Sequence, residues 1–306
     1  MIFTVCPNPC IDCTLEIEDF RVGRLNRIDN RIENMAGKAL NTAVGIKRLG
    51  GEVLSSGFMF ERGGRQYSRS LKAEGIDNDF VWNKGRLRIN YKIIDGKSMM
   101  TEINDRGDRV LVRQQEELIE KVRFYSAKAS VVIISGSLPA GVEDGFYYDL
   151  VKAAGNTKVI VDAEKGRLAE ALRAGVYMVK PNLYELETFN DERYENYEDM
   201  IRGSIKLIDA GAKYVMLSLG KNGCIFTSGD ESYFCKSENI AVNSTVGAGD
   251  SMVAAAAIAI ERGENMEEII KRAVAAATAS ITTAGTNLFT KEKFEEILPK
   301  LQVVKL

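Results

Sequence analysis

Apolar runs of strand length alternate with segments of helical periodicity along almost the whole chain. The apolar runs are short and rich in β-branched residues, which is typical of strands buried on both faces. We expect such strands at residues 2–6, 53–57, 131–135, 158–162, 176–179, 214–218 and 224–227. We expect helices at residues 39–49, 64–74, 115–125, 147–154, 197–210 and 266–283. The alternation predicts an α/β fold: a doubly wound, mostly parallel sheet with helices on both faces.

Two stretches, 13–33 and 87–103, break this rhythm because apolar and polar residues alternate in them with a period of two. Strands of this kind are exposed on one face. A hairpin over 91–103, turning at Asp95-Gly96, is expected to pair with 14–19 or with 26–32 in a second, smaller sheet.

In an α/β enzyme, such a small sheet serves as a lid. The alternative is a decorated edge of the main sheet, and edge strands are also natural dimer surfaces. We therefore expect one domain over residues 1–306 that carries a β-sheet lid. Its outward face should carry Leu15, Ile17 and Leu87 or their neighbours, and a homodimer should form through it.

Composition narrows the functions further. The 306 residues include 41 basic and 43 acidic side chains, a net charge of −2, and no histidine. This balance favours neither nucleic acid nor an anionic membrane surface. The apolar start stops at Pro7, and no later apolar run approaches a membrane span, so we expect a cytoplasmic protein without a signal peptide. Without histidine, Ser-His and Cys-His nucleophiles and histidine metal sites are excluded.

Three of the five cysteines, Cys6, Cys10 and Cys13, have the spacing of a radical iron–sulfur loop. However, Asp12 precedes the last cysteine where such enzymes usually carry an aromatic residue, and two prolines stiffen the segment. We interpret the cysteines as reduced thiols that line the end of the first strand, and keep a cluster enzyme as a remote alternative.

The strongest candidate for chemistry is the segment 243–260, in which a glycine-rich turn leads directly into an alanine-rich helix. Gly247 and Gly249 allow successive N–H groups to point one way, so the turn and the first helical turn can bind an anion. Asp250 would be repelled by a bound phosphate, which makes sense if it accepts a proton from an attacking hydroxyl. The alternative is an acidic residue placed at a helix N-terminus by the macrodipole.

Further short motifs fall at predicted strand ends, where open α/β sheets bind ligands. Gly37, Lys38 and Asn41 at a helix start suit an anionic substrate, although a capped helix with a solvated lysine would look the same. Asn182 and Glu185, after Lys180, are spaced to hold a hydrated magnesium ion. The turn from Ser218 through Gly220 to Gly223 could admit a nucleotide, and SGSLP at 135–139 would alone be merely a loop.

Taken in order, these motifs resemble the ribokinase-like PfkB carbohydrate kinases, and within them the phosphosugar branch of 1-phosphofructokinase and tagatose-6-phosphate kinase. The resemblance covers nearly the whole chain. The matching stretches are NP-x-x-D from Asn8, AGK-x-x-N, RIN from Arg88, TEIN from Thr101, SGSLP, KPN-x-x-EL, SLG-x-x-G and STVGAGDS. The last of them is highly specific.

The resemblance implies roles for individual residues. It makes Asp250 the catalytic base and Gly247, Ala248 and Gly249 the anion hole. It assigns Ser218, Gly220, Gly223 and Lys180 to ATP binding and Asn182 and Glu185 to Mg²⁺. It assigns Asp12, Gly37, Lys38, Asn41, Arg88 and, more weakly, Arg27 to the sugar phosphate. The chain departs from the family pattern at three places: Ala39, where the family usually has glycine, Cys6-Pro7 before Asn8-Pro9, and the stretch 58–63.

The expected reaction is ATP- and Mg²⁺-dependent phosphorylation of a ketohexose monophosphate to a 1,6-bisphosphate. Lys38 and Arg88 would anchor the phosphate already present, with Asp250 at the other end of the pocket. Resemblance favours fructose 1-phosphate; tagatose 6-phosphate is the alternative. A catalytically silent sugar-phosphate sensor on the same fold is the rival from another class, and it would be expected to have lost Asp250 or a glycine of its turn.

Overall fold

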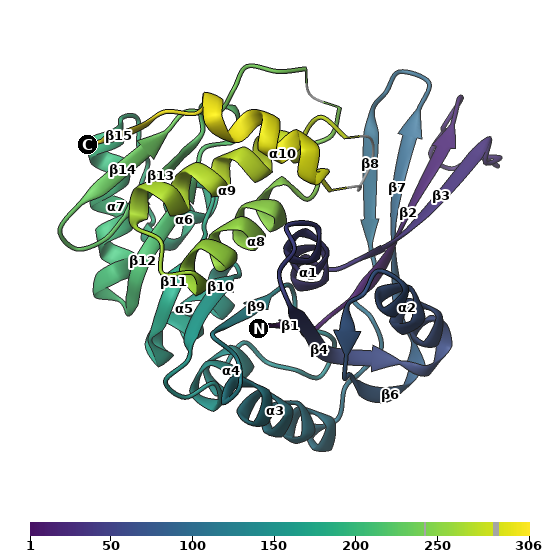
Figure 1. The fold of residues 1–306 in the computed structure, drawn as a ribbon. Helices are drawn as coiled ribbons and strands as arrows, with labels where there is room; N and C mark the ends of the chain where they lie inside the picture. The colour runs from purple at the N-terminus through teal and green to yellow at the C-terminus, as the bar shows by residue number, and fades with distance from the viewer. Residues whose placement is uncertain (242, 284–287) are drawn as a thin grey trace.

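The computed structural model describes residues 1–241, 243–283 and 288–306. The chain forms a large sheet flanked by helices, and a small sheet stands at one side of it (Figure 1). The parallel strands of the large sheet are β4 (Val53–Phe60), β1 (Ile2–Cys6), β9 (Val131–Ser135), β10 (Lys158–Asp162), β11 (Val176–Val179) and β12 (Ala212–Ser218). The predicted doubly wound α/β fold is confirmed.

Short strands extend both edges of this sheet. β13 (Cys224–Thr227), β14 (Ser232–Cys235) and β15 (Val303–Lys305) run antiparallel at one edge. β5 (Asp77–Asn78) and β6 (Val81–Arg86) pair with β4 at the other. Of these five strands, only β13 is predicted by the sequence pattern, because the others lack a continuous apolar run.

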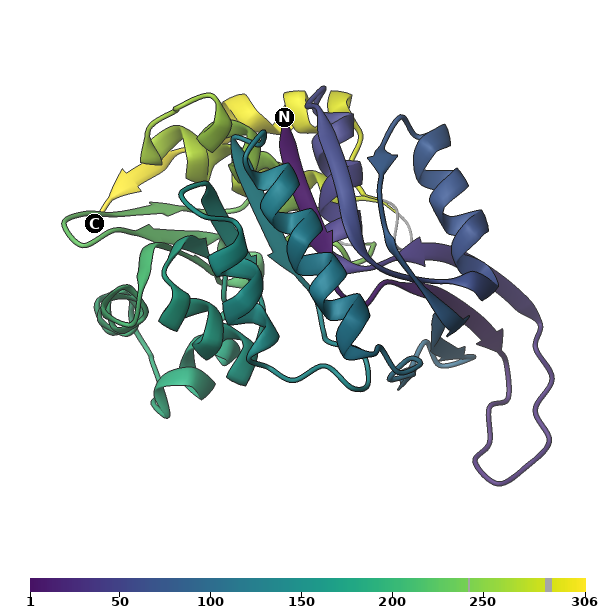
Figure 2. The ribbon, with the colours of Figure 1, turned by 90° about the horizontal axis from the view of Figure 1, so that it is seen from below.

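Helices cover both faces of the sheet (Figures 1 and 2). α1 (Lys38–Arg48), α8 (Ala248–Glu261), α9 (Met266–Ser280) and α10 (Lys291–Ile297) pack together on one face. α3 (Val112–Ser126), α4 (Phe146–Ala153), α5 (Lys165–Ala174), α6 (Leu183–Asn190) and α7 (Tyr197–Asp209) pack in succession on the other. α8 is buried on every side from Asp250 to Ile260, which explains why small alanines follow its glycine turn.

The assigned bounds of α2 and α9 differ from the predicted ones, each for a physical reason. α2 (Glu61–Ala73) is kinked at Arg62 and Gly63, so its regular part begins at Gly64 as predicted. α9 is expected to reach residue 283 but ends at Ser280. The carbonyls that follow it are used elsewhere: the Asn243 N–H donates to the Ile281 carbonyl and the Asn243 side-chain amide to the Thr282 carbonyl.

The small sheet has the strand order β3-β2-β7-β8. Its strands are β2 (Cys10–Ile17), β3 (Asn30–Ala36), β7 (Arg88–Asp95) and β8 (Met100–Asn104). The predicted hairpin is present, and it pairs with β2 rather than with the 26–32 segment. The Asp95 carboxylate accepts from the N–H groups of Lys97 and Met99, which closes the turn.

The outward face of the small sheet differs from the prediction. Ile17 and Leu87 are only 6% and 1% exposed within one chain, so they cannot form a dimer surface. The Leu87 N–H donates to the Arg62 carbonyl, so the kinked start of α2 lies against it. The exposed apolar side chains lie instead at the sheet margins and in the loop between β2 and β3: Val22, Leu25, Ile28, Ile32, Met99, Met100 and Ile103.

The cysteines occupy the core as free thiols. Cys10 and Cys13 are three positions apart on β2, so their side chains point to opposite faces of the small sheet. Burial raises the pKa of the Cys6 thiol to about 11, which opposes the thiolate form that an iron–sulfur cluster needs. The arrangement speaks against the cluster alternative. Within the described residues, no helix combines the length and apolar character needed to cross a bilayer.

Candidate active site

Asp250 lies in the first turn of α8 and is 7% exposed. Its Oδ2 accepts a hydrogen bond of 2.8 Å from the amide of Asn41, which comes from α1. Burial, with a contribution from the nearby Asp162 carboxylate, raises the pKa of Asp250 to about 6. A buried carboxylate with such a pKa is well suited to accept a proton near neutral pH.

The glycine turn before α8 is built for close approach. Gly247 has a φ of 81°, and a Cβ at this position would lie 2.5 Å from the Leu288 side chain. A Cβ at Gly249 would lie 3.2 Å from Nζ of Lys180. Among the described residues, the N–H groups of Gly249 and Asp250 have no hydrogen-bond acceptor. Two free amides, a helix N-terminus and an ammonium group therefore converge where an anion would bind.

A buried carboxylate, Asp162 at the end of β10, holds two of the predicted site lysines together. Its oxygens lie 3.2 Å from Nζ of Lys38 and 3.5 Å from Nζ of Lys180. Burial would raise the pKa of Asp162, but Lys180 and Lys38 lower it below its ordinary value. The sequence analysis did not select Asp162, although its place at the end of a parallel strand was a usable signal.

Asn182 and Glu185 form a capping box at the start of α6. The Glu185 N–H donates to Asn182 Oδ1 and the Asn182 N–H donates to Glu185 Oε2, both at 2.8 Å. The spacing of this motif is therefore explained first by helix capping. Glu185 Oε1 has no partner among the described residues, and burial raises the pKa of this carboxyl.

A cavity of about 650 Å³ lies between the small sheet and the carboxyl ends of the parallel strands. Asp12, Lys38 and Arg88 line it, as predicted for a sugar-phosphate pocket. Asp12 Oδ2 accepts a bond of 2.8 Å from Lys92, and Oδ1 accepts one of 3.2 Å from Asn90. Lys92 was missed by the sequence analysis, but the alternation Arg88, Asn90, Lys92 places all three on one face of β7.

The guanidinium group of Arg88 is fixed by hydrogen bonds to other residues of the chain. Its Nε and Nη2 donate to the Asn8 carbonyl, and its Nη1 donates to Asn90 Oδ1 and to the Asp105 carbonyl. The Asn8 amide in turn donates to Ser137 of the SGSLP loop. The two cavity walls, the β1–β2 segment and the loop after β9, are thus tied together through Asn8.

Two other predicted substrate residues are placed very differently. Gly37 caps α1 with a φ of 141°, and a Cβ there would lie 2.9 Å from Cys6 Sγ and 3.3 Å from Pro9 Cα. Only glycine lets this helix start pass so close to the β1–β2 segment. Arg27 does not line the cavity, since it lies exposed in the loop that joins β2 to β3.

A second cavity, of about 220 Å³, meets the glycine turn from the other side. Ser218, Gly220 and Gly223 form one wall, and Val274, Ala277, Thr278 and Ile281 from the α9 region form another. Gly223 has a φ of 101°, and a Cβ there would lie 2.0 Å from the Cys235 carbonyl oxygen. Ala248 and Gly249, which were predicted to form the anion hole, also line this cavity.

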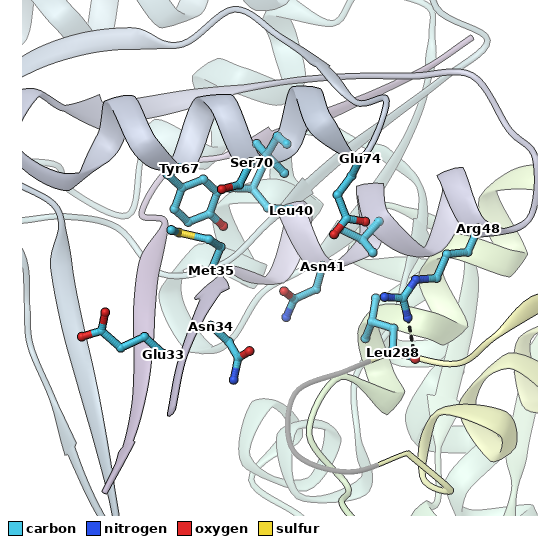
Figure 3. Close-up of a pocket in the computed structure, with 12 residues that line it drawn as sticks. Glu33, Asn34, Met35, Leu40, Asn41, Arg48, Tyr67, Ser70, Glu74 and Leu288 are labelled. Carbon is cyan, nitrogen blue, oxygen red and sulfur yellow. Dashed lines mark hydrogen bonds between the residues drawn. The ribbon is translucent and has the colours of Figure 1, made fainter. Parts of the chain in front are cut away.

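A third cavity, of about 320 Å³, lies where β3 meets α1 and α2 (Figure 3). Arg48 donates from its guanidinium group to the carbonyls of Leu288 and Phe289 beside it. Asn41 lines this cavity and also donates to Asp250. Asn41 thus lies between the Asp250 carboxylate and this third cavity.

A buried carboxylate at a helix N-terminus with free N–H groups, and a cavity on each side of its glycine turn, is an arrangement that suits phosphoryl transfer. Comparison with known proteins agrees. A family model described as pfkB family carbohydrate kinase matches residues 5–293, so the chain belongs to this family.

The relatives and solved structures are similar along their whole length. The chain is 30% identical to 1-phosphofructokinase from Borreliella burgdorferi, covering 99% of this chain and 98% of that one. It is 28% identical to 1-phosphofructokinase from Bacillus subtilis, covering 100% of each. The structure of phosphofructokinase-2 from Escherichia coli in complex with potassium superposes with a TM-score of 0.92, at 26% identity and 98% coverage of both chains.

Proposed function

We propose that this protein is a 1-phosphofructokinase, which transfers the γ-phosphoryl group of ATP to the C6 hydroxyl of fructose 1-phosphate to give fructose 1,6-bisphosphate. The observation that carries the proposal is the position of Asp250, buried at a glycine turn that lines both cavities: Val246 lines the 650 Å³ cavity, and Ala248 and Gly249 line the 220 Å³ cavity. Relatives named 1-phosphofructokinase, which match over nearly their whole length, add support.

The chain's own groups supply the chemistry. Asp250, held by Asn41, accepts the proton of the attacking hydroxyl. The free N–H groups of Gly249 and Asp250 and the ammonium group of Lys180 stabilise the charge on the transferred phosphoryl group. Positioning and electrostatic stabilisation are the main catalytic effects in phosphoryl transfer, so a rigid helix N-terminus is a suitable scaffold.

Magnesium fits these residues as an ion held mainly by phosphate and water. Mg²⁺ usually takes one or two protein carboxylates and keeps several waters. The free Oε1 of Glu185 can serve it, with Asn182 acting through water and Asp162 nearby as a second carboxylate. When bound, the ion neutralises negative charge on the phosphates of ATP. ATP and sugar phosphates are held in the cytoplasm, which is the compartment that the proposal implies.

The small sheet is proposed to act as a lid that excludes water from the reacting groups, and to carry the dimer contact. Support comes from its exposed apolar side chains, among them Val22 and Leu25 at 91% and 80% exposure. Arg27 lies in the same loop, so its proposed role in binding sugar phosphate requires movement of the loop or contact with a second chain. Hydrogen exchange should become slower in β2, β3, β7 and β8 when sugar phosphate binds; equal exchange with and without it would exclude a lid.

Release of ADP with fructose 1-phosphate, tagatose 6-phosphate, fructose 6-phosphate and free fructose tests the substrate. We expect fructose 1-phosphate to have the highest kcat/KM, tagatose 6-phosphate to be second, and fructose to be very poor because the cavity cations would lose their partner. A tenfold preference for tagatose 6-phosphate would identify the alternative kinase. Tight binding of sugar phosphate without ADP release would identify the silent sensor.

A further inference from the structure

Arg167 is a cation of the 650 Å³ cavity that takes no part in the network described above. It lies in the first turn of α5 and lines the cavity together with the 136–140 loop. Its Nε is buried and has no hydrogen-bond partner. Within the described residues, the guanidinium group has neither a hydrogen-bond acceptor nor an ion-pair partner.

An arginine with a buried and unpaired N–H group lowers the stability of the fold. A buried donor without an acceptor loses its hydration, and a cation in the first turn of a helix opposes the macrodipole. The turn that presents it adds strain, because Lys165, two residues earlier, is a non-glycine residue with a φ of 53°. Gly166 between them allows the Asp144 carboxylate to approach; a Cβ there would lie 2.1 Å from Asp144 Oδ2. Such unfavourable features are typical of positions that serve a ligand.

Three other cations of the cavity, Arg88, Lys38 and Lys92, already have protein partners, and Arg106, which also lines the cavity, is exposed. A guanidinium group has five N–H bonds, and Arg88 uses four hydrogen bonds on protein acceptors. Lys38 lies 3.2 Å from Asp162 and 3.9 Å from Glu164, and Lys92 lies 2.8 Å from Asp12. Among the described cations that line the cavity, Arg167 is the one that holds a buried N–H without a partner, and a free guanidinium face can bind a phosphate through two parallel hydrogen bonds.

We propose that Arg167 is a specificity-determining residue that binds the phosphate group already present on the sugar substrate. This inference rests on the proposed function. The 136–140 loop beside Arg167 brings Ser137, whose hydroxyl accepts from Asn8 and retains its own proton for a phosphate oxygen. Arg88 completes the contact with its one remaining N–H. The phosphate thus lies between α5 and the loop after β9, and the sugar extends from there toward Asp250.

The test compares Arg167→Met, Arg167→Lys and, as a matched control, Arg173→Met. Arg173 is in the same helix, but its side chain is 65% exposed and pairs with Glu170 outside the cavity. With Arg167→Met, the KM for fructose 1-phosphate should rise about 10- to 100-fold, as expected for loss of hydrogen bonds to a charged group. The KM for ATP should stay within about twofold, and Arg167→Lys should restore part of the loss.

The decisive readout is the ratio of kcat/KM for fructose 1-phosphate to that for free fructose. Replacing a phosphate-binding residue lowers this ratio. Replacing a purely structural residue lowers both kcat/KM values alike and leaves the ratio unchanged. An unchanged ratio in Arg167→Met, or an equal effect in Arg173→Met, would overturn the inference while the kinase assignment stands. A wild-type enzyme that phosphorylates no ketohexose phosphate would refute the proposed function, and this inference with it.

Discussion

Replacing Asp250 with asparagine should make the protein both less active and more stable. Turnover should fall by about 10²–10⁴, the usual contribution of a positioned general base. Stability should rise because the wild-type fold holds a charged carboxylate in a buried place. Asparagine removes the charge and keeps an oxygen that can accept the Asn41 hydrogen bond of 2.8 Å. Thus a single substitution separates the catalytic role of Asp250 from its structural cost.

The size of the expected stability gain follows from the pKa of Asp250. Burial raises the pKa of Asp250 from 3.8 to about 6 in the fold. Between these two values the folded state holds a proton that the unfolded state has lost, so the wild-type protein loses stability as pH rises through this window. The shift in pKa lowers the free energy of unfolding of the wild-type protein by about 3 kcal/mol at pH 8 and by less than about 1 kcal/mol at pH 4. The free energy of unfolding of Asp250→Asn should exceed that of wild type by these amounts.

Guanidinium chloride unfolding of wild type and Asp250→Asn at pH 4, 6 and 8 measures the effect. Asp250→Ala serves as the control, because it removes the charge but leaves the Asn41 amide unpaired. A stability gain that does not change with pH would refute the argument that the carboxylate is held charged in a buried site. Near-wild-type turnover in Asp250→Asn would refute its role as the base.

Three further predictions concern pH, the nucleotide turn and assembly. Because Asp250 must be ionised to accept a proton, kcat/KM should fall with decreasing pH below about 6; a flat profile from pH 5 to 8 would contradict this. Gly223→Ala should raise the KM for ATP, because its Cβ would lie 2.0 Å from the Cys235 carbonyl oxygen. Gly155 also has a positive φ, of 63°, but a Cβ there would meet nothing within 4 Å, so Gly155→Ala should leave that KM unchanged. Val22→Asp with Leu25→Asp should convert a dimer to a monomer in light scattering, whereas Leu111→Asp should not; a dimer that survives the double substitution excludes this surface.

The strands of the main sheet were predictable because each buried strand is a continuous apolar run. β1, β9, β10, β11 and β13 have the predicted bounds. The helices α5, α6 and α10 were not predicted, because they are only 10, 8 and 7 residues long and show little periodicity. Edge strands such as β14 and β15 depend on their neighbours rather than on their own sequence.

The site was predictable where a motif fixes the backbone, as in the glycine turn before Asp250. It was less predictable where function depends on pairs of distant side chains. Asp162 and Lys92 contribute through ion pairs across the fold, and spacing along the chain cannot reveal such contacts. The Asn182 and Glu185 pair shows the converse, since a motif interpreted as a metal site also forms a capping box. Ile17 and Leu87 were expected on the outside because a period-two pattern does not say what covers each face.

The central claim is that Asp250 drives phosphorylation of fructose 1-phosphate at C6. Phosphorus NMR of wild-type enzyme with fructose 1-phosphate, ATP and Mg²⁺ tests it most directly. The account predicts a new phosphomonoester resonance, that of the C6 phosphate of fructose 1,6-bisphosphate, growing together with ADP and nearly absent with Asp250→Asn. Release of inorganic phosphate with an unchanged sugar spectrum, or equal product from both proteins, would contradict it.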